Sequence, residues 1–301
     1  MNNIIGHTHI RSFFDRCISQ GRLNHAYIFA GPRHVGKRTV AEMIARTILS
    51  ITGTSCAHPD LVTLAREYDE KTGTRKKDIS IAQIRELIGR FSQSAFVRGG
   101  YQIAIIDGAE YLNTAAANAL LKTLEEPRAQ TIVILVTEDE SALLPTIRSR
   151  AQTVYFSPVP DSHIYDWLIL QGITPDRAVV MARDACGLPG YAVMWTHDEV
   201  VYTMYREEKE RLRSLFSRSF HEKIETVEDF FADRDDHITA RSRIIDIFRI
   251  WTIALREYLY EQGEYASSIP RILDTLRRAE LQLQKNVHPR LVVEHVLLSI
   301  P

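Results

Sequence analysis

The chain alternates short, almost wholly apolar runs with longer segments in which apolar residues recur every three or four positions. Short apolar runs are typical of strands buried on both faces of a parallel sheet. The runs are AYIFA (26–30), HPDLVTLA (58–65), YQIAIID (101–107), TIVILVT (131–137) and TVYF (153–156). Helical spacing between them predicts helices over 7–20, 37–50, 79–95 and 115–126. We expect Ser80 to cap the third of these helices and Asn113 or Thr114 to cap the fourth. This alternation predicts an α/β fold built on a parallel sheet with helices on both faces.

Beyond Pro158 the strand pattern stops and only helical spacing continues, including one helix predicted over 206–220. We predict an α/β core over 1–157, a small helical domain over 158–205 and a helical bundle over 206–301. Within 241–260, apolar residues share one helical face, which indicates a core or a subunit interface rather than a cofactor site. These residues are Ile244, Ile247, Phe248, Trp251 and Leu255.

Composition narrows the class of protein only slightly. Hydrophobic residues make up 45% of the 301 residues and the formal net charge is −1, so no overall charge attracts the chain to nucleic acid or membrane. Cys17, Cys56 and Cys186 are too few and too dispersed for a disulfide framework. We expect a soluble, cytoplasmic protein, since no signal-like or membrane-spanning stretch is evident. The basic run at 75–77 is expected to be a solvated loop.

The stretch GPRHVGKRT is close to a phosphate-binding loop. Gly31, Gly36 and Lys37 match the pattern, but Arg38 stands where serine or threonine is expected, and Thr39 comes one residue late. A guanidinium has no lone pair for Mg²⁺, and one residue along a helix is a rotation of about 100°. The preceding strand and following helix still predict a nucleotide-type fold. The loop is expected to hold a nucleotide statically at most.

Asp107 ends the strand in IAIIDGAE and resembles the acid that holds Mg²⁺ through water in such folds. Glu110 follows three residues later; it could act as a base, but we expect it to be solvated at a helix start. His7 and His9 flank another predicted helix start, where we expect surface or capping roles.

Several longer motifs occur in a fixed order along nearly the whole chain. They are RLNHAYIFAGP (22–32), HPDL (58–61), NALLKTLEEP (118–127), TIRSRA (146–151) and NVHPRLVVEHVLLSI (286–300). Together they resemble the AAA+ subunits of DNA polymerase clamp loaders, specifically the bacterial delta-prime family. The resemblance implies an AAA+ sheet, a small helical lid domain and a C-terminal helical collar.

The resemblance also implies a role for Arg150. In the family, a Ser-Arg-Cys motif offers its arginine to the ATP of a neighbouring subunit, where it stabilises the transferring phosphoryl group. Ser149 and Arg150 match, and Ala151 replaces a cysteine that has no expected chemistry; Arg148 is the second candidate. The implied partners are a tau/gamma-type ATPase and a delta subunit, with the sliding clamp and primer-template DNA reached through the assembly.

The chain departs from hydrolysing relatives in three places. Besides Arg38, Gly108 replaces a water-activating glutamate, and 187–190 (GLPG) lacks an arginine that senses the γ-phosphate. We therefore expect no ATP turnover by this chain and no required cofactor, with ATP or ADP bound passively at most. Many relatives hold zinc with four cysteines; Cys56 and His58 alone do not make a tetrahedral site, so no zinc is expected.

Two alternatives remain open from sequence. One is an active tau/gamma-type ATPase, against which the three departures argue. The other is a nucleotide-binding scaffold protein outside the replisome, which would have no clamp-loader partner.

Overall fold

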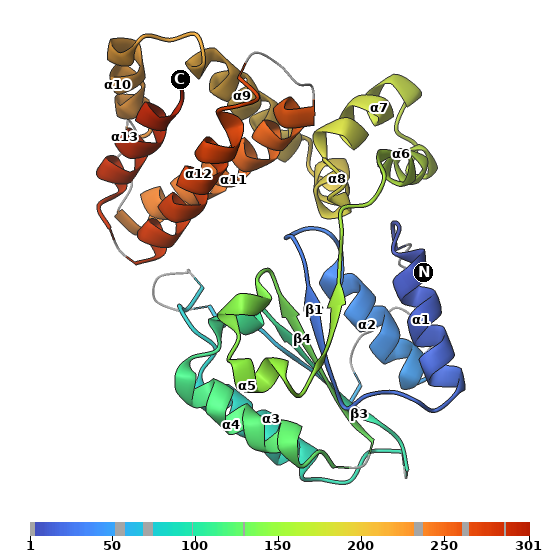
Figure 1. Cartoon of the computed structure of the whole chain (residues 1–301). Helices are drawn as coiled ribbons and strands as arrows, with labels where there is room; N and C mark the ends of the chain where they lie inside the picture. Colours follow the sequence, from blue (N-terminus) through green and yellow to red (C-terminus); the bar gives the residue numbers. More distant parts are fainter. Residues whose placement is uncertain are drawn as a thin grey trace. The chain divides into compact units, whose positions relative to one another are not determined.

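A computed structural model describes residues 4–51, 58–68, 75–97, 99–128, 130–231, 237–260, 265–285 and 287–301. The chain divides into two compact units, coloured along the sequence in Figure 1. The first consists of Met1–Ile164 with Gly187–Gly190, and the second of Tyr165–Cys186 with Tyr191–Pro301. The division into three domains with boundaries at 157 and 205 stays a prediction.

The first unit is built on one five-stranded sheet in which every neighbouring pair is parallel. The strands lie in the order β2-β3-β4-β1-β5. Their bounds are β1 Ala26–Ala30, β2 Leu61–Leu64, β3 Gln102–Asp107, β4 Thr131–Thr137 and β5 Gln152–Tyr155. The predicted α/β class with a parallel sheet is confirmed, and β2 is shorter than the apolar run suggested.

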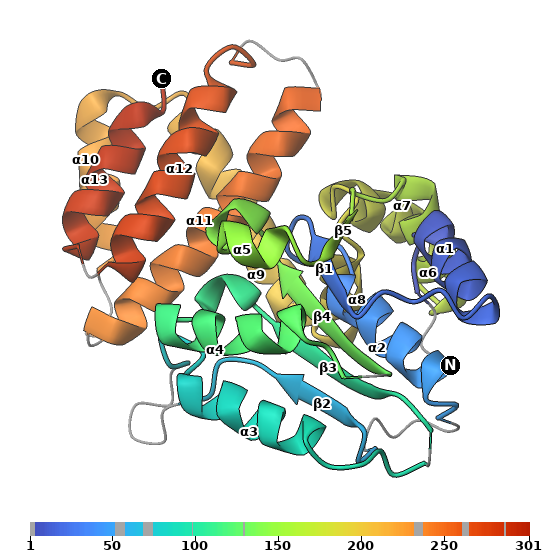
Figure 2. The ribbon, with the colours of Figure 1, turned by 60° about the horizontal axis from the view of Figure 1, so that its bottom comes forward.

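Helices cover both faces of this sheet (Figure 2). They are α1 Thr8–Ser19, α2 Lys37–Ile48, α3 Ile81–Phe91, α4 Thr114–Glu125 and α5 Pro145–Arg148, with short 3₁₀ turns at Ala109–Tyr111 and Glu140–Ala142. Alternate residues of β1 point to opposite faces. Ile28 joins the cluster that contains Leu87 of α3 and Leu120 of α4. Phe29 instead packs against Phe14 of α1, with ring centroids 5.7 Å apart.

Side-chain caps set the starts of two of these helices. Ser80 and Gln83 form a capping box at the start of α3, so the cap predicted at Ser80 is confirmed. Asn113 accepts a hydrogen bond of 2.8 Å from the backbone N–H of Ala116 and begins α4. Of the two caps considered for α4, Asn113 is therefore the one used.

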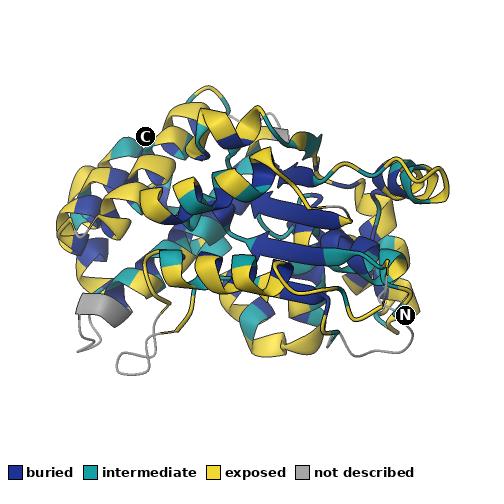
Figure 3. Ribbon diagram, turned by 90° about the horizontal axis from the view of Figure 1, so that it is seen from below, coloured by how far each residue is buried: buried dark blue, intermediate teal, exposed yellow. Residues whose placement is uncertain are grey.

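The second unit is helical, and α6 runs into it from the first. The helices are α6 Asp161–Leu170, α7 Pro175–Asp184, α8 Pro189–His197, α9 Glu199–Leu215, α10 Phe220–Asp229, α11 His237–Tyr260, α12 Ile269–Gln284 and α13 Pro289–Ser299. The apolar stripe predicted in 241–260 is core: four of its five members are fully buried, and Ile247 packs beside them. Figure 3 shows this pattern of buried inner and exposed outer helix faces. No helix in the described ranges is both long and apolar enough to cross a bilayer.

Candidate functional site

The carboxyl ends of three neighbouring strands gather the candidate nucleotide residues at one edge of the sheet. The glycine loop follows β1, Asp107 ends β3, and Thr137 ends β4, which lies between them. Ala30 pairs with Thr137, and Asp107 pairs with Val136, so these ends are level. In open parallel sheets, ligands bind beyond the carboxyl ends of the strands. The sequence-predicted residues are thus brought together here.

The loop has the backbone that its glycines permit. Gly36 adopts a φ of 105°, which L-residues with side chains rarely adopt. A Cβ at Gly31 would lie 2.3 Å from the backbone oxygen of Phe156, so no larger residue fits there. His34 also has a positive φ, of 60°. The backbone of this turn therefore depends on glycine at positions 31 and 36.

Lys37 is turned onto its own loop. Its ammonium is buried and donates hydrogen bonds of 2.7 Å to the backbone oxygens of both Gly31 and Pro32. Burial lowers the pKa of Lys37, while the charges of nearby carboxylates, Glu138 foremost, oppose the shift. A phosphate would have to displace these internal hydrogen bonds before it could use the ammonium.

Arg38 places a cation beside Asp107. Its Nη1 lies 3.1 Å from Asp107 Oδ2, and its Nε lies 2.8 Å from Glu42 Oε1, one helical turn further along α2. The hydrogen bond with Glu42 is the largest cause that raises the Arg38 pKa. Thr39 is exposed on α2. The acid that would hold Mg²⁺ is thus paired with a guanidinium, and a magnesium–nucleotide complex does not fit this arrangement.

Glu110 lies in the same region, at the start of the 3₁₀ turn Ala109–Tyr111 as expected, but its carboxylate is partly buried rather than solvated. Its Oε2 is buried without a hydrogen-bond partner, and burial raises the pKa of its carboxyl, while a hydrogen bond with Thr137 opposes the shift. The chain folds back here because Gly108, with a φ of 80°, allows the turn after β3. A Cβ at Gly108 would lie 2.9 Å from the Tyr111 ring.

Neither glycine of the segment that lacks the phosphate-sensing arginine can carry a side chain without a shift of its neighbours. At Gly190 a Cβ would lie 2.8 Å from the backbone oxygen of His34 in the glycine loop. The N–H of Gly190 donates to that same oxygen at 2.8 Å. At Gly187, with a φ of 73°, a Cβ would lie 2.6 Å from Pro158. Backbone packing therefore requires small residues where an arginine was expected in hydrolysing relatives.

His7 hydrogen-bonds to the glycine loop, contrary to the expectation of a surface or capping histidine. It is buried, and its Nε2–H donates a hydrogen bond of 2.8 Å to the backbone oxygen of Val35. Burial lowers the pKa of His7, which favours the neutral ring. It stands at the N-cap position of α1 but makes no side-chain cap, whereas His9 is exposed as expected.

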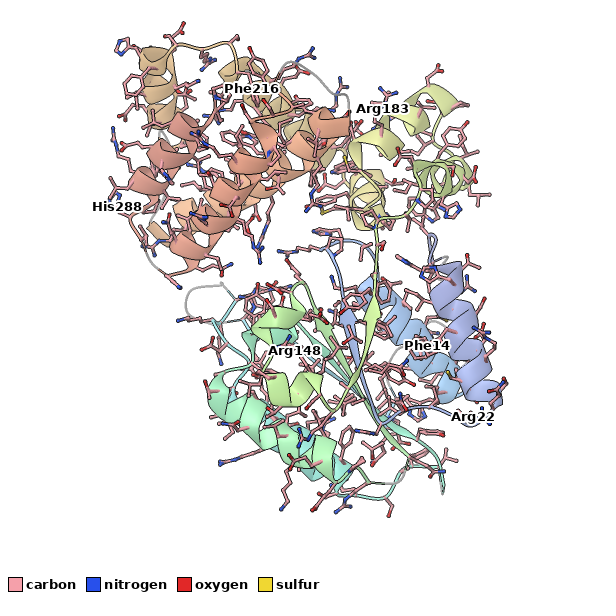
Figure 4. All side chains as sticks on the ribbon, viewed as in Figure 1. Phe14, Arg22, Arg148, Arg183, Phe216 and His288 are labelled. Atoms are coloured by element: carbon pink, nitrogen blue, oxygen red, sulfur yellow. The ribbon has the colours of Figure 1, made fainter. Side chains whose placement is uncertain are left out.

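The second candidate site lies at the end of α5, close to where Figure 4 labels Arg148. Ser149 caps α5, and its hydroxyl donates to the Thr146 oxygen at 3.0 Å. Arg150 donates from Nη1 to the same oxygen at 3.0 Å and to Ser149 Oγ at 3.1 Å. Its Nη2 lies 2.9 Å from Oε1 of Glu125 at the end of α4. The pair with Glu125 was not foreseen.

Two further predictions concern less informative segments. Cys56 lies outside the described residues, while His58 Nδ1 accepts a hydrogen bond of 3.2 Å from the backbone N–H of Asp60. Within the described part of the chain, no three His, Cys, Asp or Glu side chains are grouped to hold a metal. In the basic run, Lys76 pairs with Glu67 at 2.7 Å and is exposed, as expected of a solvated loop.

Comparison with known proteins gives the family. A family model described as DNA polymerase III, delta subunit matches residues 6–160, just over half of the chain. The chain belongs to this family. The chain is 34% identical over 180 residues to the DNA polymerase III subunit delta' of Bacillus subtilis, an alignment that covers 55% of this chain and 52% of that protein.

Two other relatives are comparably similar to this chain. The chain is 36% identical over 137 residues to the subunit delta' of Escherichia coli, covering 45% of this chain and 39% of that protein. A subunit gamma/tau of Mycobacterium tuberculosis is 34% identical over 166 residues, covering 52% of this chain and 28% of that protein. The chain thus spans about half or less of the length of these relatives. A gamma subunit-related protein from Thermotoga maritima superposes with a TM-score of 0.49 at 17% identity, covering 95% of this chain and 97% of that one.

Proposed function

We propose that this chain is a cytoplasmic, delta-prime-type subunit of a bacterial clamp loader. It takes part in loading the sliding clamp onto primed DNA, does not turn over ATP itself, and supplies Arg150 in trans to the ATP of a neighbouring subunit. The proposal rests on family membership, on the motif that contains Arg150, and on the internal cation at Asp107. The relatives are named DNA polymerase III subunits delta' and gamma/tau, and we propose a tau/gamma-type ATPase and a delta subunit as partners of this chain.

The observation that carries the lack of turnover is the ion pair between Arg38 and Asp107 at 3.1 Å. A working phosphate loop needs a hydroxyl and this acid to hold Mg²⁺, which neutralises charge on the phosphates. Here the acid is already neutralised by the guanidinium, and Lys37 is bonded to its own loop. Gly108 and Gly190 supply neither a base nor a cation. We therefore propose that the chain needs no metal or zinc and holds ATP or ADP statically at most.

Two observations support the trans role of Arg150. Its side chain is 36% exposed, so it is partly accessible from solvent. Arg150 follows directly after a short helix whose end is capped by Ser149, which fixes the backbone position of the arginine. An arginine that stabilises a transferring phosphoryl group in trans is worth about 10³–10⁵ in rate. A loss of that size is large enough to measure in a mixed assembly.

The test is ATP turnover by a loader reconstituted from this chain with tau/gamma-type and delta subunits, sliding clamp and primed DNA. We expect Arg150→Ala to lower the turnover at this interface about 10³-fold or more. Arg90→Ala is the matched control, because Arg90 makes an exposed ion pair of the same length, 2.9 Å, with Glu86. Arg148→Ala tests the second candidate arginine.

The outcomes separate the competing functions. Unchanged turnover with Arg150→Ala would leave this chain as a scaffold within the loader. Turnover by the isolated chain would instead favour an active tau/gamma-type ATPase. Failure to assemble with clamp-loader subunits would favour a scaffold protein outside the replisome.

A further inference from the structure

Two sequence motifs that lie far apart in the chain meet through one ion pair. Glu125 belongs to NALLKTLEEP at the end of α4, and Arg150 belongs to TIRSRA after α5. Their side chains approach to 2.9 Å between Arg150 Nη2 and Glu125 Oε1, and they are 36% and 48% exposed. The pair lies wholly within the first unit.

The ion pair occupies the guanidinium of Arg150, which is the group that would bind a phosphate. A guanidinium recognises carboxylate and phosphate alike, through two parallel hydrogen bonds from a planar fork. Both terminal nitrogens of Arg150 already donate within the chain, Nη2 to Glu125 and Nη1 to the Thr146 oxygen and Ser149 Oγ. A phosphate approaching the same fork would also meet the negative charge of Glu125. The carboxylate and the phosphate therefore compete for one group.

We propose that Glu125 is a latch residue, which holds Arg150 on its own chain until the terminal phosphate of a neighbour's nucleoside triphosphate displaces it. This inference rests on the proposed trans role of Arg150. Glu125 acts through Arg150 and does not touch the nucleotide, so it is a positioning residue. Because the pair is solvent-exposed, its strength is modest and the exchange needs no unfolding.

The latch can be tested first in the isolated full chain, without any ATPase. Phenylglyoxal labels accessible arginines, and peptide mass spectrometry gives the labelling rate of Arg150 separately from that of other arginines. We expect Glu125→Gln, which keeps size and an acceptor oxygen but removes the charge, to speed labelling of Arg150 about two- to fivefold. Glu126→Gln is the matched control, because Glu126 is the adjacent, exposed glutamate.

The salt dependence of the labelling rate distinguishes an electrostatic role of Glu125 from a purely structural one. An exposed ion pair is screened as the Debye length falls from about 10 Å at 0.1 M to about 3 Å at 1 M ionic strength. The ratio of labelling rates between Glu125→Gln and the unaltered chain should therefore fall toward one as salt is raised. An equal labelling rate at low salt would overturn the latch.

The second test uses the reconstituted loader without clamp or DNA. If Glu125 restrains Arg150, both Glu125→Gln and Glu125→Ala should raise this basal ATP turnover about two- to fivefold, while Glu126→Gln leaves it unchanged. If Glu125 only supports the fold or aims the arginine, Glu125→Ala should lower turnover instead. A lowered or unchanged rate overturns the inference.

Arg150→Ala separates this failure from failure of the proposed function. A large loss with Arg150→Ala, together with no gain from Glu125→Gln, would remove only the latch. No loss with Arg150→Ala would remove the trans role, and the latch with it.

Discussion

Replacing Arg38 by threonine tests the internal cation directly. The substitution removes the guanidinium from Asp107 and places a hydroxyl directly after Lys37, where a phosphate loop uses it to hold Mg²⁺. Arg38 is 51% exposed and makes two charge contacts, with Asp107 and Glu42. Exposed pairs of this kind are worth about 0.2–1 kcal/mol each after solvent screening. Without nucleotide, Arg38→Thr should therefore lower the unfolding free energy by roughly 0.5–1.5 kcal/mol.

With magnesium and ATP the same variant should behave differently from the unaltered chain. A ligand that binds only the folded state at about 100 times its Kd adds about 2.7 kcal/mol of stability. A change of 1 kcal/mol moves the Tm of a unit of this size by about 2–4 °C. We expect magnesium with ATP to raise the Tm of Arg38→Thr by several degrees and to leave the unaltered chain nearly unchanged. Thermal unfolding with and without a chelator measures the difference.

Arg38→Met is the control, since it removes the charge without adding a hydroxyl. It should share the small loss of stability and show no magnesium-dependent gain. The reasoning is refuted if magnesium adds to the stability of the unaltered chain in the presence of ATP, or if Arg38→Met gains as much as Arg38→Thr. Hydrolysis should remain absent in all three, because Gly108 and Gly190 are unchanged.

Three further substitutions test individual contacts. Gly190→Ala should lower the unfolding free energy by about 1–3 kcal/mol, because its Cβ would lie 2.8 Å from the His34 oxygen; an unchanged Tm would contradict this close packing. In the unaltered chain, the unfolding free energy measured with urea should fall as the pH drops through 6.5, the unfolded-state pKa of His7. His7→Gln should make this fall smaller. The reason is that burial lowers the folded-state pKa, so the unfolded chain binds more protons there, and an unaltered pH profile would count against it. Lys209→Met should cost about 3–5 kcal/mol in denaturant unfolding, since the ammonium lies 2.7 Å from buried Asp184; a loss near zero would mean that the carboxylate finds another partner.

The fold follows from local patterns that the sequence displays. Apolar runs between helical segments located all five strands, and Ser80 and Asn113 marked two helix starts. A boundary was missed between α9 and α10, where one continuous helix was expected over 206–220. The signal was present, since Ser219 and Glu222 form a capping box three residues apart. Local chemistry of this kind is readable because both partners are neighbours in sequence.

The contacts that define the site are not local, and they could not be predicted from spacing. Arg38 and Asp107 are 69 residues apart, and only the strand order brings them together. The solvation of Glu110 was misjudged for the same reason, because its carboxylate interacts with Thr137, which lies at the end of β4 and 27 residues away. By contrast, the contact between Arg38 and Glu42 follows the i,i+4 spacing of a helix and was readable from sequence.

The altered loop is stabilised by donors from its own chain. Two of its carbonyls accept from Lys37, a third accepts from the N–H of Gly190, and a fourth accepts from His7. Buried carbonyls without partners are costly, so these donors favour a folded loop in the absence of a ligand. A subunit whose loop does not depend on nucleotide would keep the same conformation throughout a neighbour's ATP cycle. A constant loop would suit a chain proposed to present Arg150 to another subunit's phosphate. The timing of that contact would then be set by the neighbour and by the competition with Glu125.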